Sequence, residues 1–228
     1  MQRVCQLAVV ATLLLSGAHA SGQIVFDFET GGDQGWGNPF SADPANTVML
    51  TVENVGGSNR LRAIRDGSFQ EVSRRSHSQA DPFHLAMAAA AVNESLVTLS
   101  YDWYVDTAPL TYGSFLQLGT YYNTDSGFYG QDFPNAGKDV ELNGTQLASG
   151  GVFSGTVSET LSAKGINLPT GETGYELGLI INGDGPAGGQ RVYFDNVRIA
   201  IVPEPASLAL AGLAATAIAM MRRRSAVR

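Results

Sequence analysis

Cysteine and lysine are almost absent from this chain of 228 residues, and each absence excludes a class of site. The only cysteine is Cys5, so residues 21–202 contain no disulfide and no thiolate metal site. These 182 residues carry 20 acidic and 9 basic side chains, a net charge of −11, with Lys138 and Lys164 as the only lysines. Such a balance argues against binding to nucleic acid or anionic lipid.

Residues typical of catalytic sites are also few. Only His77 and His84 lie within residues 21–202, and their spacing fits neither a zinc-binding helix nor a catalytic triad. A Gly-x-Ser-x-Gly motif is missing. Asp27 and Glu29 lie two residues apart, and paired carboxylates can hydrolyse glycosides, but no glycosidase motif surrounds them. We therefore predict that the chain is not an enzyme, with a glycoside hydrolase as the less favoured alternative.

The N-terminus has the pattern of a secretory signal peptide. Arg3 precedes a largely apolar run of nine residues, 7–15, and Ala18 and Ala20 form a small-x-small cleavage site. An N-terminal membrane anchor is the alternative, but a bilayer requires about 20 apolar residues. We predict that residues 1–20 are removed and that the remainder is exported.

A second apolar segment lies near the C-terminus. Residues 206–221 are uncharged, and as a helix they would span about 24 Å, a marginal length for a transmembrane anchor. The basic residues that follow should stay in the cytoplasm, which leaves residues 21–202 outside. Two prolines before the segment should hold residues 202–205 extended, a conformation that a protease could accept.

This order of features resembles the PEP-CTERM sorting signal of Gram-negative bacteria. The matching residues are Pro203, Glu204, Pro205, Arg222, Arg223 and Arg224. The resemblance implies that an exosortase, a membrane protease or transpeptidase, reads residues 203–228. The protein would be held transiently in the inner membrane and then reach the cell surface or extracellular matrix. The alternative is a proline-rich spacer on a permanent anchor.

Alternation of apolar and polar residues predicts β-strands throughout residues 21–202. The candidate strands are 24–29, 47–52, 61–64, 96–105, 114–122, 152–161, 175–182 and 191–201. About eight strands separated by turns indicate an all-β, antiparallel β-sandwich. In residues 96–105 the alternation places Trp103 with the inward set, and Asp102 and Tyr104 outside. Asp81-Pro82 followed by an alanine-rich run predicts one short helix to Val92, or alternatively a weakly ordered crossover.

The last predicted strand changes phase at Asp195-Asn196. Either a bulge shifts the register there, or Tyr193 and Asp195 point inward together with Val197. A buried carboxylate needs a partner, and a bound cation is one candidate.

Residues 26–29 with Asp33 and Trp36, and residues 194–197, resemble the terminal strands of jelly-roll carbohydrate-binding modules. In such modules the first and last strands lie side by side, and acidic residues from both often hold structural calcium. The resemblance implies a jelly-roll fold with Glu29 and Asp195 as candidate Ca²⁺ ligands and Asp33 as a weaker one. The alternative is that Glu29 and Asp195 pair with Arg191 or Arg198.

Aromatic residues gather in the segment 112–132. A sugar ring is apolar on its faces and polar at its rim, so it binds flat aromatic side chains flanked by hydrogen-bonding groups. Tyr121, Phe128 and Tyr129 are the candidate platform, with the alternative that they cover a sheet edge. We therefore predict a surface or matrix protein that associates with extracellular polysaccharide, or else a structural biofilm or coat component without a specific ligand.

Overall fold

The computed structural model describes residues 23–37, 49–65, 69–92, 97–107, 113–130, 138–161, 168–184 and 190–201, and residues 23–200 form one compact unit. The predicted cleavage residues Ala18 and Ala20 lie outside these ranges, as does the predicted sorting signal 203–228. None of the helices in the described ranges is both long enough and apolar enough to cross a bilayer.

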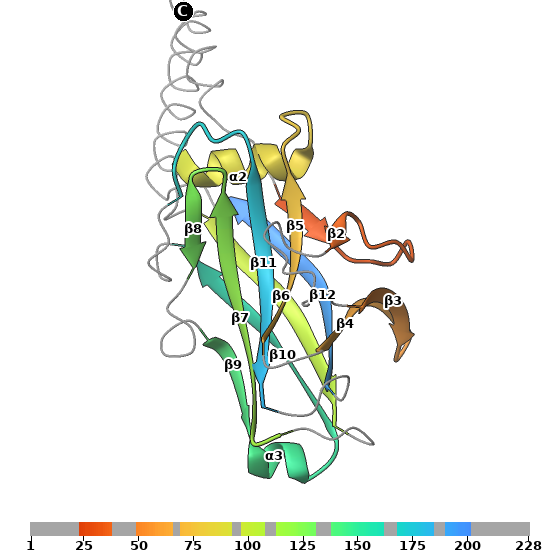
Figure 1. Cartoon of the computed structure of the whole chain (residues 1–228). Coiled ribbons are helices and arrows are strands. Elements are labelled where there is room, and N and C mark those ends of the chain that lie inside the picture. The colour runs from red at the N-terminus through yellow and green to blue at the C-terminus, as the bar shows by residue number, and fades with distance from the viewer. Residues whose placement is uncertain are drawn as a thin grey trace, which may run out of the picture. The chain divides into compact units, whose positions relative to one another are not determined.

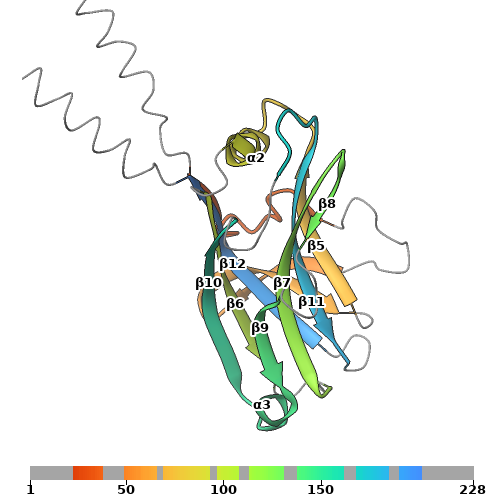
Figure 2. The same ribbon diagram turned by 90° about the vertical axis from the view of Figure 1, so that its left-hand side faces the viewer.

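Two antiparallel sheets of six strands each form the domain. The first sheet contains, in spatial order, β10 (Val152–Thr160), β6 (Val97–Asp106), β12 (Gln190–Ile201), β4 (Ser58–Arg65) and β3 (Met49–Val55), with β1 (Gln23–Phe26) also paired to β12. The second contains β2 (Trp36–Gly37), β5 (Phe69–Ser76), β11 (Tyr175–Gly183), β7 (Phe115–Thr124) and β8 (Gly127–Gly130), with β9 (Lys138–Asn143) also paired to β7. The sheets form two facing layers (Figures 1 and 2). The predicted all-β, antiparallel sandwich is confirmed, with more strands than expected.

The core lies between the two sheets and follows the predicted alternation. On β6, Leu99 and Tyr101 are buried, and the Tyr101 ring meets the Phe194 ring of β12 edge to face at 5.9 Å between centroids. Leu177 and Leu179 of β11 are buried on the opposite layer. The Tyr101 hydroxyl donates to Asp139 Oδ2 of β9 at 2.8 Å, so its polar end is also satisfied.

A helix closes one end of the sandwich. α2 (Pro82–Val92) contacts β1 of the first sheet and β5 and β11 of the second. Asp81 caps it, because Oδ1 accepts a hydrogen bond from the Phe83 amide at 2.9 Å. The predicted helix is therefore confirmed. A shorter helix, α3 (Gly144–Ala148), lies at the other end (Figure 2).

The phase change in β12 is a bulge. Asn196 has a φ of 48°, in the left-handed region, while Phe194 and Val197 on either side of Asp195-Asn196 are both fully buried. β12 pairs with β4 up to Phe194 and with β1 from Val197, so the bulge marks the place where the strand changes partner. The first and last strands lie side by side, as the resemblance to carbohydrate-binding modules implied.

Candidate functional site

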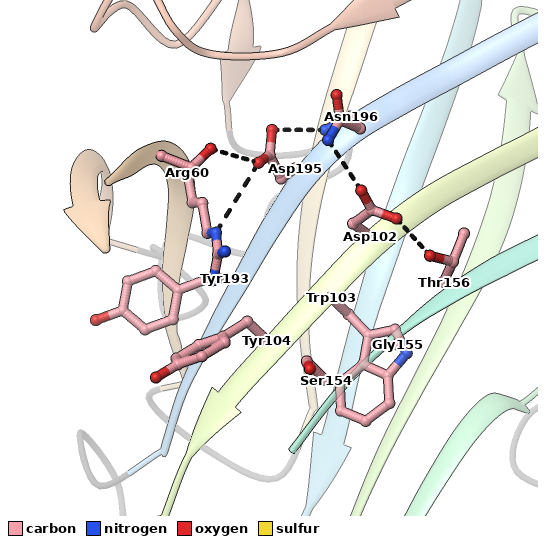
Figure 3. Close-up of a pocket in the computed structure, with 11 residues that line it drawn as sticks. Arg60, Asp102, Trp103, Tyr104, Ser154, Gly155, Thr156, Tyr193, Asp195 and Asn196 are labelled. Carbon is pink, nitrogen blue, oxygen red and sulfur yellow. Dashed lines mark hydrogen bonds and ion pairs between the residues drawn. The ribbon is translucent and has the colours of Figure 1, made fainter. Parts of the chain in front are cut away.

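A cleft of about 500 Å³ opens on the face of the first sheet that points away from the core (Figure 3). Four neighbouring strands line it, namely β4, β12, β6 and β10. On β6, Asp102 and Tyr104 reach it because they alternate with the buried Tyr101 and Val105. The outward positions of Asp102 and Tyr104 agree with the predicted phase of this strand.

Aromatic side chains form one part of the lining. The rings of Tyr104 and Tyr193 meet edge to face, with centroids 5.7 Å apart. The Arg60 guanidinium lies over the Tyr104 ring at 4.8 Å from its centroid. Trp103 is only partly buried and is one of the residues that line the cleft, but its indole lies against Gly155, on the side of β6 that carries the buried Tyr101 and Val105, as the alternation predicted. A Cβ at Gly155 would lie 3.1 Å from Trp103 Nε1, so a glycine gives the indole the space it occupies.

A chain of hydrogen bonds crosses the sheet beside these rings. Thr156 Oγ1 donates to Asp102 Oδ1 at 2.6 Å, and Asn196 Nδ2 donates to Asp102 Oδ2 at 2.9 Å. The Asn196 amide donates to Asp195 Oδ1 at 2.7 Å, and Ser58 Oγ lies 2.9 Å from Asp195 Oδ2. The bulge is what makes the chain continuous, because it presents both the amide and the side chain of Asn196 to neighbouring carboxylates.

Asp195 is a buried member of this hydrogen-bond network and is 6% exposed. Burial raises the pKa of Asp195, and the nearby charge of Glu29 raises it further. Hydrogen bonds from Ser58 and the Asn196 amide, and the charge of Arg60, act in the opposite direction. Arg60 Nε lies 3.9 Å from Asp195 Oδ2, so the arginine partner of Asp195 is Arg60 rather than Arg191 or Arg198.

The structure brings together two of the three predicted calcium ligands. Ser58 Oγ lies 2.7 Å from Glu29 Oε1 as well as 2.9 Å from Asp195 Oδ2. Asp33 is engaged elsewhere, where its Oδ1 accepts a hydrogen bond from the Gly35 amide at 3.0 Å. Within the described residues, no group of three or more His, Cys, Asp or Glu side chains is placed to hold a metal ion.

The three aromatic residues predicted as a sugar platform are neighbours on β7 and β8 of the second sheet. Phe128 is 60% exposed and stacks on Tyr121 at 5.5 Å between centroids. Tyr121 is only 2% exposed, and its hydroxyl donates to Glu176 Oε1 at 3.1 Å. Tyr129 pairs with Tyr122, so strand alternation places it on the opposite face of the second sheet from the Tyr121–Phe128 stack. Of this predicted platform, Phe128 offers the most accessible ring.

Several residues of the cleft are not predicted as site residues from the sequence, Arg60 among them, and Tyr193 and Asn196 enter only through the phase change of the last strand. The strand register brings Arg60 and Asn196 to this face from positions 136 residues apart, and no local pattern encodes that proximity. The outward placement of Asp102 and Tyr104 could be predicted, because both lie on the outer face of the strand predicted for residues 96–105, where a carboxylate and an aromatic residue stand side by side.

Comparisons with known proteins agree with both resemblances. Residues 202–224 match the family model described as the PEP-CTERM protein-sorting motif. A carbohydrate-binding module of family 28, specific for non-crystalline cellulose, superposes with a TM-score of 0.52 at 16% identity, covering 76% of this chain and 91% of that one. A family 27 module from Caldicellulosiruptor saccharolyticus, solved with mannohexaose, gives 0.44 at 13% identity, covering 81% and 99%. The xylan-binding CBM22-1 domain of Paenibacillus barcinonensis Xyn10C gives 0.44 at 12% identity, covering 81% and 97%.

No curated protein matches the sequence. The chain thus has the jelly-roll β-sandwich fold of carbohydrate-binding modules. More particularly, it carries a PEP-CTERM motif, which indicates an exported, exosortase-processed protein of the cell surface.

Proposed function

We propose that this protein is a non-enzymatic surface or matrix protein that binds exopolysaccharide through the cleft on the first sheet. The observation that carries the proposal is the composition of that cleft, in which the aromatic Tyr104 and Tyr193 border the polar Asp102 and Asn196. A pyranose ring requires this combination, because its faces are apolar and its rim carries hydroxyl groups.

The size and geometry of the cleft support a glycan ligand. Its volume of about 500 Å³ lies within the range typical of small-molecule sites. Each oxygen of Asp102 accepts one hydrogen bond from the protein, which leaves further lone pairs for sugar hydroxyl groups. The cleft is lined by neighbouring, hydrogen-bonded strands of one sheet, among them the antiparallel pair β6 and β10. An extended polysaccharide bound there would therefore contact several strands of one rigid scaffold.

The test is binding of the exported protein to a panel of soluble polysaccharides that includes a neutral glucan, a neutral mannan, alginate and chitosan. Tyr104→Ala should weaken binding about tenfold or more, because an aromatic contact to a ligand is worth about 1–3 kcal/mol and about 1.4 kcal/mol equals a factor of ten. Phe128→Ala is the matched control, since it removes an exposed ring of the second sheet.

The alternatives correspond to distinct outcomes. If no polysaccharide of the panel binds, the structural coat component without a specific ligand replaces the proposal. If a polysaccharide is degraded by the purified protein, the chain is a hydrolase. Loss of binding in Phe128→Ala but not in Tyr104→Ala would move the site to the stacked rings of Tyr121 and Phe128 on the second sheet.

We also propose that Glu29 and Asp195 hold a structural Ca²⁺ ion together with Ser58. A hydroxyl group has one hydrogen, so Ser58 can donate to only one of the two carboxylates that face it. A calcium ion would be held by oxygen ligands of this kind and would offset the repulsion between the carboxylates. Native mass spectrometry should detect a bound calcium ion that EDTA removes and that Glu29→Gln abolishes. An unchanged mass in EDTA would refute this site.

A further inference from the structure

The charged side chains that line the cleft favour some classes of polysaccharide over others. Among the lining residues that the structure describes, the charged side chains are Arg60, Asp102 and Asp195. Arg60 is engaged twice, with Asp195 at 3.9 Å and with the Tyr104 ring at 4.8 Å. Binding of an anionic polysaccharide is therefore disfavoured, because Arg60 is the cation among the described lining residues and it is already engaged, whereas Asp102 would repel the ligand.

Asp102 is the carboxylate that remains for a ligand. Its direct hydrogen-bond partners, Thr156 and Asn196, are neutral. The guanidinium of Arg198 lies one side chain further away, where it donates to Asn196 Oδ1 at 3.4 Å. Figure 3 shows Asp102 beside Thr156 and Asn196, with Arg60 and Tyr193 on the other side of the cleft. A ligand cation at Asp102 would thus contact a carboxylate and would be separated from the guanidinium of Arg60.

One cationic side chain of the protein, Arg60, already lies against this face of the sheet. The contacts of Arg60 show that an aromatic ring and a carboxylate on this face together accommodate a positively charged group. Asp102 lies on the same outward face of β6 as Tyr104, the ring over which Arg60 is placed. A net charge of −11 over residues 21–202 would add long-range attraction for a cationic polymer.

We propose that the polysaccharide recognised by this cleft carries free amino groups and that Asp102 pairs with one of its ammonium groups. This inference rests on the proposed function and specifies its ligand as an amino-sugar polymer that is at least partly free of N-acetyl groups. Protonated amines are retained by Asp102, whereas N-acetylation removes the charge and so removes the ion pair.

The test compares a glucosamine oligomer with its fully N-acetylated counterpart of equal length, using the exported full-length protein and calorimetry. At about pH 5.5, where carboxylates and amines are both charged, the glucosamine oligomer should bind at least about tenfold more tightly, as expected for a charge-assisted hydrogen bond. The preference should decline at about pH 9 and in about 0.5 M salt, because the amines lose their protons and the salt screens the pair.

Two variants locate the effect. Asp102→Asn should remove the preference, because the amide keeps an acceptor for Thr156 but has no charge. Glu141→Gln is the matched control, since it removes one negative charge from β9 of the second sheet, and it should keep the full preference.

Equal affinity for the two oligomers would overturn the amine assignment and leave glycan binding intact. An unchanged preference in Asp102→Asn would overturn the role of Asp102. Equally tight binding of an oligolysine of the same charge would show that the protein responds to charge without sugar, which also overturns the assignment. Absence of binding to every polysaccharide would overturn both this inference and the proposed function.

Discussion

Replacing Gly178 by alanine tests the packing of the second sheet. Gly178 pairs directly with Tyr121, and a Cβ added at Gly178 would lie 1.7 Å from Tyr121 Cε1. β11 is paired on one side with β5 and on the other with β7, so the backbone of Gly178 has little freedom to move. The Tyr121 ring must therefore leave its place.

The cost follows from what Tyr121 loses. Its ring stacks on Phe128 at 5.5 Å, a contact worth about 0.5–1.5 kcal/mol. Its hydroxyl donates to the Glu176 carboxylate at 3.1 Å, and a buried hydrogen bond to a charged group is worth about 1.5–3 kcal/mol. We expect Gly178→Ala to lower the free energy of unfolding by about 2–4 kcal/mol, or the Tm by about 4–16 °C for a domain of this size.

Urea unfolding and calorimetry of the exported protein measure this cost. Gly37→Ala is the matched control, because Gly37 also lies in a strand of the second sheet and a Cβ there meets no atom within 4 Å. In a Tyr121→Ala background, Gly178→Ala should cost little, since the clashing ring is gone. A Gly178→Ala protein within about 0.5 kcal/mol of the wild type would refute the reasoning.

Two further predictions concern stability. Burial and the nearby charge of Glu176 raise the pKa of Glu71 to about 7, so the folded state favours the neutral acid and loses stability as the pH rises from about 4.5 to about 7. Glu71→Gln should therefore stabilise the protein at about pH 8 and be close to neutral at about pH 4, and equal effects at both values in chemical denaturation would contradict this. Asn143 and Gln146 form a reciprocal cap at the start of α3, so Asn143→Ala should cost about 1 kcal/mol in the same assay, whereas an unchanged midpoint would contradict the role of the cap.

The sandwich could be predicted because apolar and polar residues alternate along most of its strands. In β5 this alternation fails. On β5, Arg74 pairs with the buried Leu177 of β11, a register position at which alternation requires an apolar residue. The arginine is accommodated because it pairs with Asp81 at 2.5 Å and lies over the Phe83 ring at 5.2 Å. Both partners come from the cap and first turn of α2, so the strand depends on a tertiary contact that the local pattern does not contain.

The cleft was only partly accessible from the sequence for a similar reason. The phase change at Asp195-Asn196 predicts a bulge as one of two alternatives, and both alternatives make Asp195 unusual. The partners of the bulge, Ser58 on β4 and Asp102 on β6, are determined by the order of strands in the sheet, which alternation does not specify. The predicted platform of Tyr121, Phe128 and Tyr129 follows the density of aromatic residues in the sequence, whereas the contact between Tyr104 and Tyr193 joins two strands far apart in the sequence and has no local pattern.

The most direct test of glycan binding in this cleft uses the two tryptophans of the chain. Trp103 lines the cleft, while Trp36 is 2% exposed in β2 of the second sheet. When the exported protein is titrated with each polysaccharide of the panel, the polysaccharide that binds should cause a saturable change in tryptophan fluorescence. Binding in the cleft predicts that this change disappears in Trp103→Phe and persists in Trp36→Phe. A saturable change that persists unaltered in Trp103→Phe would contradict the proposed site.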